Sequence, residues 1–306
     1  MINLEELKKS FRGFIALSEP MSKYTSFRIG GPADVYIEPA DKFDLVKIID
    51  FLKTNNEPYI IIGRGSNLLI SDEGYRGVVL NFESGLSNIS IKENIVTAES
   101  GVATGRFVDF CIQNNLAGVE MLAGIPGTVG GAIMMNAGAY GGEISDFITE
   151  VEILRDGKIQ TISKANSNFK YRKSGFLNDI IIGGNFSLPK GNTGELLKRR
   201  RELLLKRNES QPLNFPNSGS MFKNPEGTFA AKEVESVGLK GKQVGGAQIS
   251  EKHGNFILNK GNAKANDVFE LIKIARETVF QKNKIKLELE VKMIGFSQQE
   301  YEQVHI

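Results

Sequence analysis

The sequence predicts an α+β protein built from two domains, and three observations predict this class. Short apolar strands alternate with helical runs in the first half of the chain. Two glycine-dense segments interrupt that alternation, and the second half ends in a long amphipathic helix followed by a strictly alternating run. We therefore expect a glycine-rich domain at residues 1–190 and a second domain at residues 191–306.

The first half carries the strand and helix patterns in turn. Residues 41–56 and residues 105–115 each predict an amphipathic helix, because apolar side chains recur there at helical spacing. Residues 150–163 predict a hairpin, because Asp156-Gly157 is a two-residue pair that favours a type I′ turn. Short strands are predicted at residues 33–39, 58–63, 77–82, 87–93 and 94–100.

The second half carries two helical patterns and one alternating pattern. Residues 195–210 predict a charged helix, and residues 267–283 predict a longer amphipathic helix. Residues 285–295 alternate between apolar and charged side chains, as a strand with one buried face does. On this pattern alone, Glu290 is a solvent-facing residue like its charged neighbours. The apolar face consists of Leu287, Leu289, Val291 and Met293.

Composition and charge exclude several classes of protein. The 306-residue chain is 41% hydrophobic and 24% charged, which is the balance of a globular protein with a real core. A net charge of +2 argues against a dedicated nucleic-acid binder. With one cysteine and two histidines, neither a disulfide nor a metal site is expected. No signal peptide and no apolar run of about 18 residues is present, so we expect a cytoplasmic protein without a membrane partner.

Glycine is concentrated in GRGSNLL, residues 63–69, and in GIPGTVGGAIMMNAGAYGG, residues 124–142. Because glycine is costly in chain entropy, such segments indicate tight turns or a ligand that lies directly on the backbone. The first segment is not a P-loop, since no Gly-Lys-Ser/Thr ending follows, and Leu68 replaces the third glycine of a dinucleotide fingerprint. A pyrophosphate held by backbone N–H groups explains both segments together. A plain turn and a tightly packed crossover are the alternatives.

Two other segments group polar residues with functional chemistry. Tyr171 and Arg172, in FKYRKSGF, either present a phenol and a guanidinium to an anionic substrate or form an exposed helix end. Ser220, in PNSGSMFKNP, lies near Lys223 and is either a nucleophile or proton donor or part of a rigid turn. No Gly-x-Ser-x-Gly order supports a hydrolase. By itself His253 is typical of a surface or turn histidine.

The chain resembles the UDP-N-acetylenolpyruvoylglucosamine reductase family in seven blocks that occur in the same order. They cover nearly the whole chain, from about Tyr24 to Gly295, which makes the resemblance highly specific. The blocks are YTSFRIGGPAD, GRGSNLLISD, GIPGTVGGAIMMNAGAYGGEI, YRKS, SGSMFKNP, GGAQISEKHGNFILN and LELEV.

The resemblance implies a fold, a cofactor and a reaction. Residues 1–190 are similar to an FAD-binding domain of the vanillyl-alcohol-oxidase (PCMH) type with two α+β subdomains, and residues 191–306 to a substrate-binding domain. FAD is then the cofactor and NADPH the hydride donor. The implied substrate is a UDP-sugar enolpyruvyl ether, UDP-N-acetylglucosamine enolpyruvyl ether, which is reduced to UDP-N-acetylmuramate for peptidoglycan synthesis.

The resemblance also implies roles for individual residues. Arg172 would bind the substrate carboxylate and oppose the developing enolate charge, and Ser220 would protonate the α-carbon. Glu290 would polarise or protonate the enolate, which requires a neutral carboxyl group. The implied substrate-binding residues are Tyr171, Lys223, Asn224 and His253. The implied cofactor-binding residues are Gly63, Arg64, Gly65, Ser66, Asn67, Leu68, Gly124, Ile125, Pro126, Gly127, Thr128, Gly130, Gly131, Ala132, Asn136, Ala137 and Gly138.

The chain departs from some relatives in lacking an inserted loop whose tyrosine folds over the substrate, so it resembles the shorter family type. An FAD-dependent oxidase of the same fold, acting on an alcohol or a sugar, is the alternative. It is disfavoured because neither glycine segment carries a histidine or cysteine that could tether a flavin. A flavin-free binding module that uses the basic helix at 198–207 is a third hypothesis. The oligomeric state stays open, with a monomer as the expectation.

Overall fold

The structure is a computed structural model that describes residues 4–305, and its chain forms two compact units. The first unit comprises the residues through Leu17, Val35–Arg64 and Gly77–Arg207. The second unit comprises Ser18–Asp34, Gly65–Arg76 and the residues from Asn208 onward. Each unit is therefore assembled from segments that are far apart in the sequence.

The first unit contains a four-stranded sheet with the order β1-β2-β5-β3, in which β3 and β5 run parallel. The aliphatic stripe predicted for residues 41–56 is buried on α2 (Lys42–Thr54), and α1 (Leu4–Ser10) packs beside it. The chain passes from one unit to the other within β1, β2 and β5. The strands are Phe14–Pro20 (β1), Pro32–Glu38 (β2), Tyr75–Asn81 (β5) and Tyr59–Ile62 (β3).

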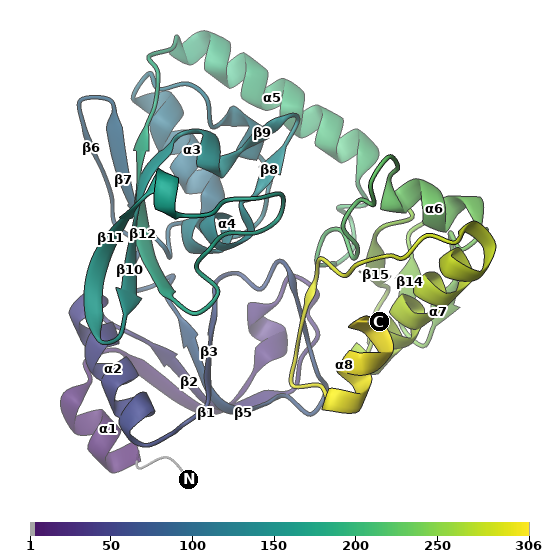
Figure 1. Ribbon diagram of the computed structural model, residues 1–306, viewed down its shortest axis with the longest axis horizontal. Coiled ribbons are helices and arrows are strands. Elements are labelled where there is room, and N and C mark those ends of the chain that lie inside the picture. Colours follow the sequence, from purple (N-terminus) through teal and green to yellow (C-terminus); the bar gives the residue numbers. More distant parts are fainter. Residues whose placement is uncertain (1–3, 306) are drawn as a thin grey trace. The chain divides into compact units, whose positions relative to one another are not determined.

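The other large sheet of the first unit is antiparallel, with the order β11-β10-β12-β7-β6 (Figure 1). Its predicted hairpin is confirmed, because Arg155 pairs with Lys158 across Asp156-Gly157, whose φ values of 49° and 73° are those of a left-handed turn. The strands are Lys158–Ser163 (β11), Ile148–Arg155 (β10), Ile180–Ser187 (β12), Ile95–Glu99 (β7) and Ile89–Lys92 (β6).

Three helices and a short ribbon complete the first unit. Helix α4 (Val129–Met135) packs against β12 and β7, and it also contacts α3 (Thr104–Gln113), as the labels in Figure 1 allow the reader to follow. The ribbon pairs β8 (Gly138–Ala139) with β9 (Gly142–Glu143). The charged helix α5 (Thr193–Ser210) buries only two of its leucines. Within residues 4–305, no helix is both long enough and apolar enough to cross a membrane.

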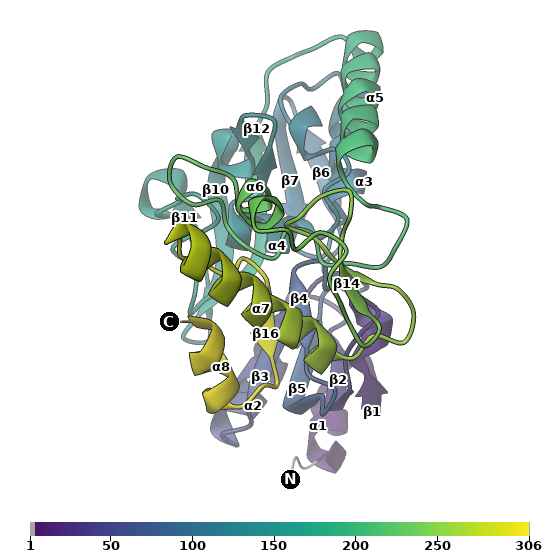
Figure 2. The ribbon, with the colours of Figure 1, turned by 90° about the vertical axis from the view of Figure 1, so that its right-hand side faces the viewer.

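The second unit is built around helix α7 (Ala265–Asn283), which packs on β13 and β14 and contacts α6 and α8 (Figure 2). The helical spacing predicted for this segment is confirmed by burial of its apolar stripe. The stripe consists of Val268, Leu271, Ile272, Ala275 and Val279. The other elements are α6 (Ala230–Ser236), β13 (Gln243–Val244), β14 (Ala247–Ile249), β15 (Ile257–Asn259) and α8 (Gln298–His305).

The alternating run at residues 285–295 is regular over only part of its length. Its four apolar side chains are buried as predicted, but only β16 (Lys292–Ile294) forms a ladder, parallel to β4 (Leu68–Ile70). Before β16, the N–H groups of Glu290 and Val291 both point to the carbonyl of Met221, at 2.8 and 3.4 Å. This shared acceptor interrupts the regular pairing.

The division into units differs from the predicted boundary at residue 190. Helix α5 belongs to the first unit as far as Arg207. Phe27, Ile29 and Leu69 belong to the second, because their side chains lie in its hydrophobic core. Sequence patterns group neighbours along the chain, whereas burial groups these residues with the distant helix α7.

Candidate active site

A cavity in the first unit collects residues from both glycine-dense segments. Its volume is about 130 Å³, and it is lined by Gly63 from the first segment and by Thr128, Gly130 and Gly131 from the second. Whole ligand sites usually measure about 300–1,000 Å³, so this cavity is large enough for part of an extended group. The rest of its lining consists of Ile61, Ile62, Phe82, Ser100, Gly101, Met134, Asp179 and Ile181.

The glycines that line this cavity are required for different reasons. A Cβ atom on Gly130 would lie 2.5 Å from Cβ of Ser100, and one on Gly63 would lie 2.6 Å from Oγ1 of Thr128. Close packing inside the unit therefore requires glycine at both positions. A Cβ atom on Gly131 would meet no neighbour closer than Thr128 Oγ1 at 3.6 Å. Gly131 thus lines the cavity at a position where the protein itself leaves room for a Cβ atom.

The N–H groups of Gly130 and Gly131 are already used within the unit. The Gly130 N–H donates to the carbonyl of Ser100 at 2.9 Å, and the Gly131 N–H donates to Oγ1 of Thr128 at 3.4 Å. Thr128 is the N-cap residue of α4. Close approach of the backbone, rather than donation from these two N–H groups, is what the glycines contribute here.

Ser100 is a cavity residue that sequence reasoning missed. It is 3% exposed, and its Oγ has no hydrogen-bond partner among the described residues. A buried hydroxyl without a partner costs about 1–3 kcal/mol, so a ligand that pairs with it removes that cost. The available signal was weak, because Ser100 simply ends a predicted strand and precedes a glycine.

Arg172 lies at the centre of a tight turn in the first unit. Lys170 and Lys173 exchange two backbone hydrogen bonds of 2.9 and 3.0 Å around Tyr171 and Arg172. Arg172 has a φ of 53°, a left-handed conformation that costs a non-glycine residue about 1–3 kcal/mol. Its guanidinium lies 4.9 Å from the ring centroid of Tyr171 and donates to the carbonyl of Gly138 at 3.0 Å. The segment is a strained turn, not a helix end.

Asn136 connects the glycine-dense segment to that turn. It ends α4 in the left-handed conformation, with a φ of 42°, and its side chain is buried. Its Nδ2 donates to Glu143 Oε2 at 2.6 Å and to the carbonyl of Lys170 at 3.2 Å, while its Oδ1 accepts from the N–H of Ser145 at 3.3 Å. The structure thus brings the predicted cofactor residues Asn136 and Gly138 to the predicted catalytic Arg172.

The other predicted cofactor residues of the first unit have varied surroundings. Arg64 forms a salt bridge of 2.9 Å with Glu83 at the surface. Gly124 approaches α5 so closely that a Cβ atom would lie 2.9 Å from Cδ of Arg207. The carbonyl of Gly127 accepts a hydrogen bond from the first residue of α3 at 3.0 Å. The remaining positions in this segment are Ile125, Pro126, Ala132 and Ala137.

In the second unit, three separate segments meet at the backbone of Glu290. Nδ2 of Asn67 donates to the carbonyl of Glu290 at 3.0 Å, and the Glu290 N–H donates to the carbonyl of Met221 at 2.8 Å. The N–H of Lys292 donates to the carbonyl of Asn67 at 2.9 Å. Because Met221 follows Ser220, one network contains the predicted proton donor segment, the predicted acid and part of the predicted cofactor loop.

The loop from Gly65 to Leu68 belongs to this second unit. Gly65 has a φ of 55°, and a Cβ atom there would lie 2.2 Å from the carbonyl oxygen of Tyr24. Its own carbonyl accepts from the N–H of Ser26 at 3.2 Å. After Ser66 and Asn67, Leu68 begins β4. Glycine is therefore required at Gly65 by its backbone conformation and by local packing.

Lys223 and Asn224 follow Ser220 on the same loop. The ammonium of Lys223 pairs with the carboxylate of Glu288, and the backbone N–H of Lys223 donates to the Glu288 carbonyl at 2.8 Å. Oδ1 of Asn224 accepts from the N–H of Ala230, at the start of α6, at 3.2 Å. Both predicted substrate-binding side chains are thus anchored within the second unit.

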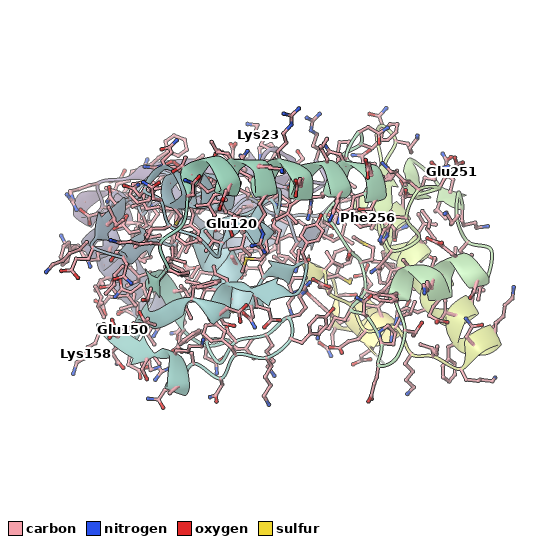
Figure 3. The ribbon with its side chains drawn as sticks, turned by 90° about the horizontal axis from the view of Figure 1, so that it is seen from above. Lys23, Glu120, Glu150, Lys158, Glu251 and Phe256 are labelled. Atoms are coloured by element: carbon pink, nitrogen blue, oxygen red, sulfur yellow. The ribbon has the colours of Figure 1, made fainter. Side chains whose placement is uncertain are left out.

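His253 is half-buried beside the segment of Ser220. Its ring packs edge to face against Phe256, labelled in Figure 3, with centroids 4.8 Å apart, and Phe256 forms a backbone bridge with Ser220. Burial lowers the pKa of His253 below its usual value, although Glu235 opposes this shift. Its Nδ1 accepts from the N–H of Asn255 at 3.3 Å, which assigns the proton of the neutral ring to Nε2.

The two sequence families found in the chain agree with this description. A family described as "FAD binding domain" matches residues 33–163. A family described as "UDP-N-acetylenolpyruvoylglucosamine reductase, C-terminal domain" matches residues 211–294. The fold and the glycine-lined cavity together are those of an FAD-dependent oxidoreductase.

The chain belongs to the UDP-N-acetylenolpyruvoylglucosamine reductase family. It is 41% identical to the enzyme of that name from Chloroherpeton thalassium, over 97% of this chain and 99% of the relative. It is 44% identical to that of Agathobacter rectalis, over 90% of this chain and 93% of the relative. The crystal structure of the reductase from Thermus caldophilus matches with a TM-score of 0.80 at 33% identity, over 92% of this chain and 99% of that one.

These matches confirm the predicted family and the α+β fold class with its FAD-binding domain. The roles of individual residues remain predictions. What the structure adds is their placement: Arg172 with Asn136 and Gly138 in the first unit, and Ser220, Glu290 and Asn67 in one network of the second.

Proposed function

We propose that this protein reduces UDP-N-acetylglucosamine enolpyruvyl ether to UDP-N-acetylmuramate with NADPH, through FAD, in the synthesis of peptidoglycan precursors. The observation that carries the proposal is identity of 41% with a reductase of this substrate over 97% of the chain. The oxidase alternative gains no support from the neighbourhood of the cavity, whose lining residues include neither a histidine nor a cysteine.

The first-unit cavity is suited to part of the FAD molecule. Gly131 leaves space where a side chain would intrude, and the buried hydroxyl of Ser100 offers a hydrogen bond that no described protein atom uses. Gly63 and Gly130 keep the walls close together because each packs against a neighbouring side chain. When bound, FAD supplies hydride transfer from NADPH to the substrate.

The reaction adds a hydride to the β-carbon of the enol ether and a proton to its α-carbon, while NADPH becomes NADP⁺. Negative charge develops on the substrate carboxylate and α-carbon in the transition state, so fixed positive groups accelerate the step. Arg172 suits this role, because its left-handed turn and its bond to Gly138 hold the guanidinium in one place.

Ser220 would give the proton to the α-carbon, and Glu290 would act on the enolate. A serine hydroxyl is a weak acid, so its placement relative to the substrate decides its value as a donor. The backbone bond between Glu290 and Met221 keeps both groups in a common frame. Protonation by Glu290 requires its carboxyl group to be neutral at the working pH.

Four further side chains would bind the substrate. Lys223 provides a cation that pairs with the exposed carboxylate of Glu288, and Asn224 provides an amide at the end of the same loop. Tyr171 is exposed beside Arg172. His253, neutral because of burial, would donate from Nε2 rather than act as a cation.

We also propose a division of labour and a cellular setting. Residues 1–190 would hold the FAD, and residues 191–306 would bind the substrate. The chain would act in the cytoplasm, as a monomer and without a membrane or nucleic acid partner. Size-exclusion chromatography with light scattering tests the monomer directly.

The reductase and oxidase functions are separated by an anaerobic experiment on the purified flavoprotein. NADPH should bleach the flavin absorbance, and the enolpyruvyl substrate should then restore it in the absence of oxygen. A flavin that NADPH leaves oxidised, but that an alcohol or sugar reduces, would establish the oxidase instead. A colourless protein that does not take up FAD would support the binding-module hypothesis.

A further inference from the structure

The side-chain amide of Asn255 hydrogen-bonds both the N–H and the carbonyl of Phe222, as the backbone of a neighbouring β-strand would. Its Oδ1 accepts from the N–H of Phe222 at 2.9 Å, and its Nδ2 donates to the carbonyl of Phe222 at 2.8 Å. The residue is 3% exposed, so both bonds lie away from water. Buried amides of this kind fix geometry strongly, because each group would be costly without its partner.

The backbone of Asn255 makes a further hydrogen bond to the same segment. Its carbonyl accepts from the N–H of Met221 at 2.9 Å, and the next residue, Phe256, bridges to Ser220. Three consecutive residues that include the predicted proton donor are therefore held from one side by Asn255 and Phe256. The position of the Ser220 side chain therefore depends on how the backbone of residues 220–222 is held.

Two other predicted site residues are hydrogen-bonded to the backbone of this region. The carbonyl of Met221 accepts from the N–H of Glu290 at 2.8 Å, and the N–H of Asn255 donates to Nδ1 of His253 at 3.3 Å. Asn255 thus lies at the intersection of the segments that carry Ser220, Glu290 and His253, without being a predicted contact of the substrate.

We propose that Asn255 is a positioning residue for the substrate half-reaction: its side-chain amide fixes the backbone at Phe222 and so sets where Ser220 presents its hydroxyl to the substrate. This inference rests on the proposed function of Ser220 as proton donor. It assigns to Asn255 an effect on reoxidation of the reduced enzyme, not on its reduction by NADPH.

Asn259 provides a matched control for loss of a buried amide. It is 8% exposed and lies in the same unit, where its Nδ2 donates to the carbonyl of Phe27 at 3.0 Å and its Oδ1 accepts from Gly261 at 3.0 Å. None of its side-chain bonds reaches the loop of Ser220. A purely structural effect should therefore be equal in Asn255→Ala and Asn259→Ala.

The experiment uses FAD-loaded, full-length protein in anaerobic stopped-flow, with the wild type, Asn255→Ala, Asn259→Ala and Ser220→Ala. Both asparagine variants should have a lower melting temperature and an unchanged rate of reduction by NADPH. Reoxidation by the enolpyruvyl substrate should slow by about 10- to 100-fold in Asn255→Ala, because a reacting group is misplaced, and should be unchanged in Asn259→Ala. Hydrogen exchange should accelerate at residues 220–223 in that variant.

Asn255→Asp adds a readout that simple destabilisation cannot imitate. An ionised carboxylate accepts from the Phe222 N–H but cannot donate to the Phe222 carbonyl, whereas the protonated acid can do both. The reoxidation rate of Asn255→Asp relative to the wild type should therefore rise as the pH falls. A ratio that is constant with pH would contradict the positioning role.

The outcomes also separate this inference from the function on which it rests. Slow reoxidation in Ser220→Ala together with normal reoxidation in Asn255→Ala would overturn the role of Asn255 and leave that of Ser220 intact. Equal slowing in Asn255→Ala and Asn259→Ala would reduce Asn255 to a structural residue. Normal reoxidation in Ser220→Ala would remove the proton-donor role itself.

Discussion

The amide of Asn67 donates a 3.0 Å hydrogen bond to the backbone carbonyl of Glu290, and the two residues are also joined through the pairing of β4 with β16. The family resemblance implies that Asn67 binds the cofactor and that Glu290 is catalytic. Their direct contact means that the predicted cofactor loop and the segment of the predicted acid are hydrogen-bonded to each other within the second unit.

Asn67→Ala should slow reoxidation by substrate, because the carbonyl of Glu290 loses a fixed donor. The free energy of unfolding, measured in urea, should fall by about 0.5–1.5 kcal/mol, the usual net value of one hydrogen bond. Asn283→Ala is the control, since its amide binds Glu233 and Ser236 elsewhere in the same unit. If Asn67→Ala loses FAD while its remaining holoenzyme reoxidises normally, the residue serves the cofactor and not Glu290.

Gly131→Val should yield a folded protein that does not retain flavin, because a Cβ atom at this cavity-lining position meets no protein neighbour closer than 3.6 Å and the added methyl groups would compete with the cofactor for space. Gly130→Val should instead unfold or destabilise the unit, since its Cβ would lie 2.5 Å from Ser100. Thermal unfolding and the flavin-to-protein absorbance ratio separate the two effects. Gly105→Val, at an exposed glycine of α3 with no neighbour within 4 Å, controls for the loss of a helical glycine. Retention of flavin by Gly131→Val would place the cofactor elsewhere.

Ser100→Ala should weaken the binding of FAD without destabilising the FAD-free protein. Without FAD, removing a buried hydroxyl that has no partner among the described residues should leave the free energy of unfolding unchanged or raise it. With FAD, the variant should bind more weakly by roughly 0.5–1.5 kcal/mol if the ligand uses this hydroxyl. Isothermal titration of the deflavinated protein with FAD measures the second effect, and equal affinities would exclude Ser100 as a cofactor contact.

His253 should make folding stability depend on pH in the acidic range. Burial lowers its pKa in the folded protein below the usual 6.5, so the unfolded chain binds the proton more readily. The contribution is therefore fully present above about pH 6.5 and is lost as the pH falls towards the folded pKa. His253→Gln should lose less stability than the wild type between about pH 7.5 and about pH 5. Identical urea midpoint shifts in the two proteins would contradict this account.

Local patterns predicted the regular elements well because periodicity reports which face is buried. The stripe on α7 and the Asp156-Gly157 hairpin were both specified by neighbours along the chain. Strand β12 was not predicted, since its segment IIIGGNFS is buried on both faces and shows no alternation. The same limitation hid the grouping of Phe27 and Leu69 with α7, which depends on contacts between distant segments.

The sequence predicts those residues of the candidate site that belong to a recognisable motif or to which the family resemblance assigns a role. The glycine content indicates that the backbone approaches a ligand or another segment closely. It does not distinguish Gly130, where a Cβ atom would strike Ser100, from Gly131, which lines the cavity without such a contact. Ser100 and Asn255 belong to no recognisable motif. The hydroxyl of Ser100 is buried without a hydrogen-bond partner among the described residues, and the side-chain amide of Asn255 makes two hydrogen bonds to Phe222. Both properties depend on the folded structure.

The central claim is that the protein reduces an enolpyruvyl ether with a proton from Ser220. Anaerobic two-step titration of the wild type and Ser220→Ala tests it most directly, with Ser220→Cys as the conservative control. NADPH should bleach the flavin in all three proteins, and the UDP-sugar enolpyruvyl ether should restore its colour in the wild type, measurably in Ser220→Cys and hardly at all in Ser220→Ala. Rapid recolouring of Ser220→Ala, or a wild-type flavin that the substrate leaves bleached, would contradict the account.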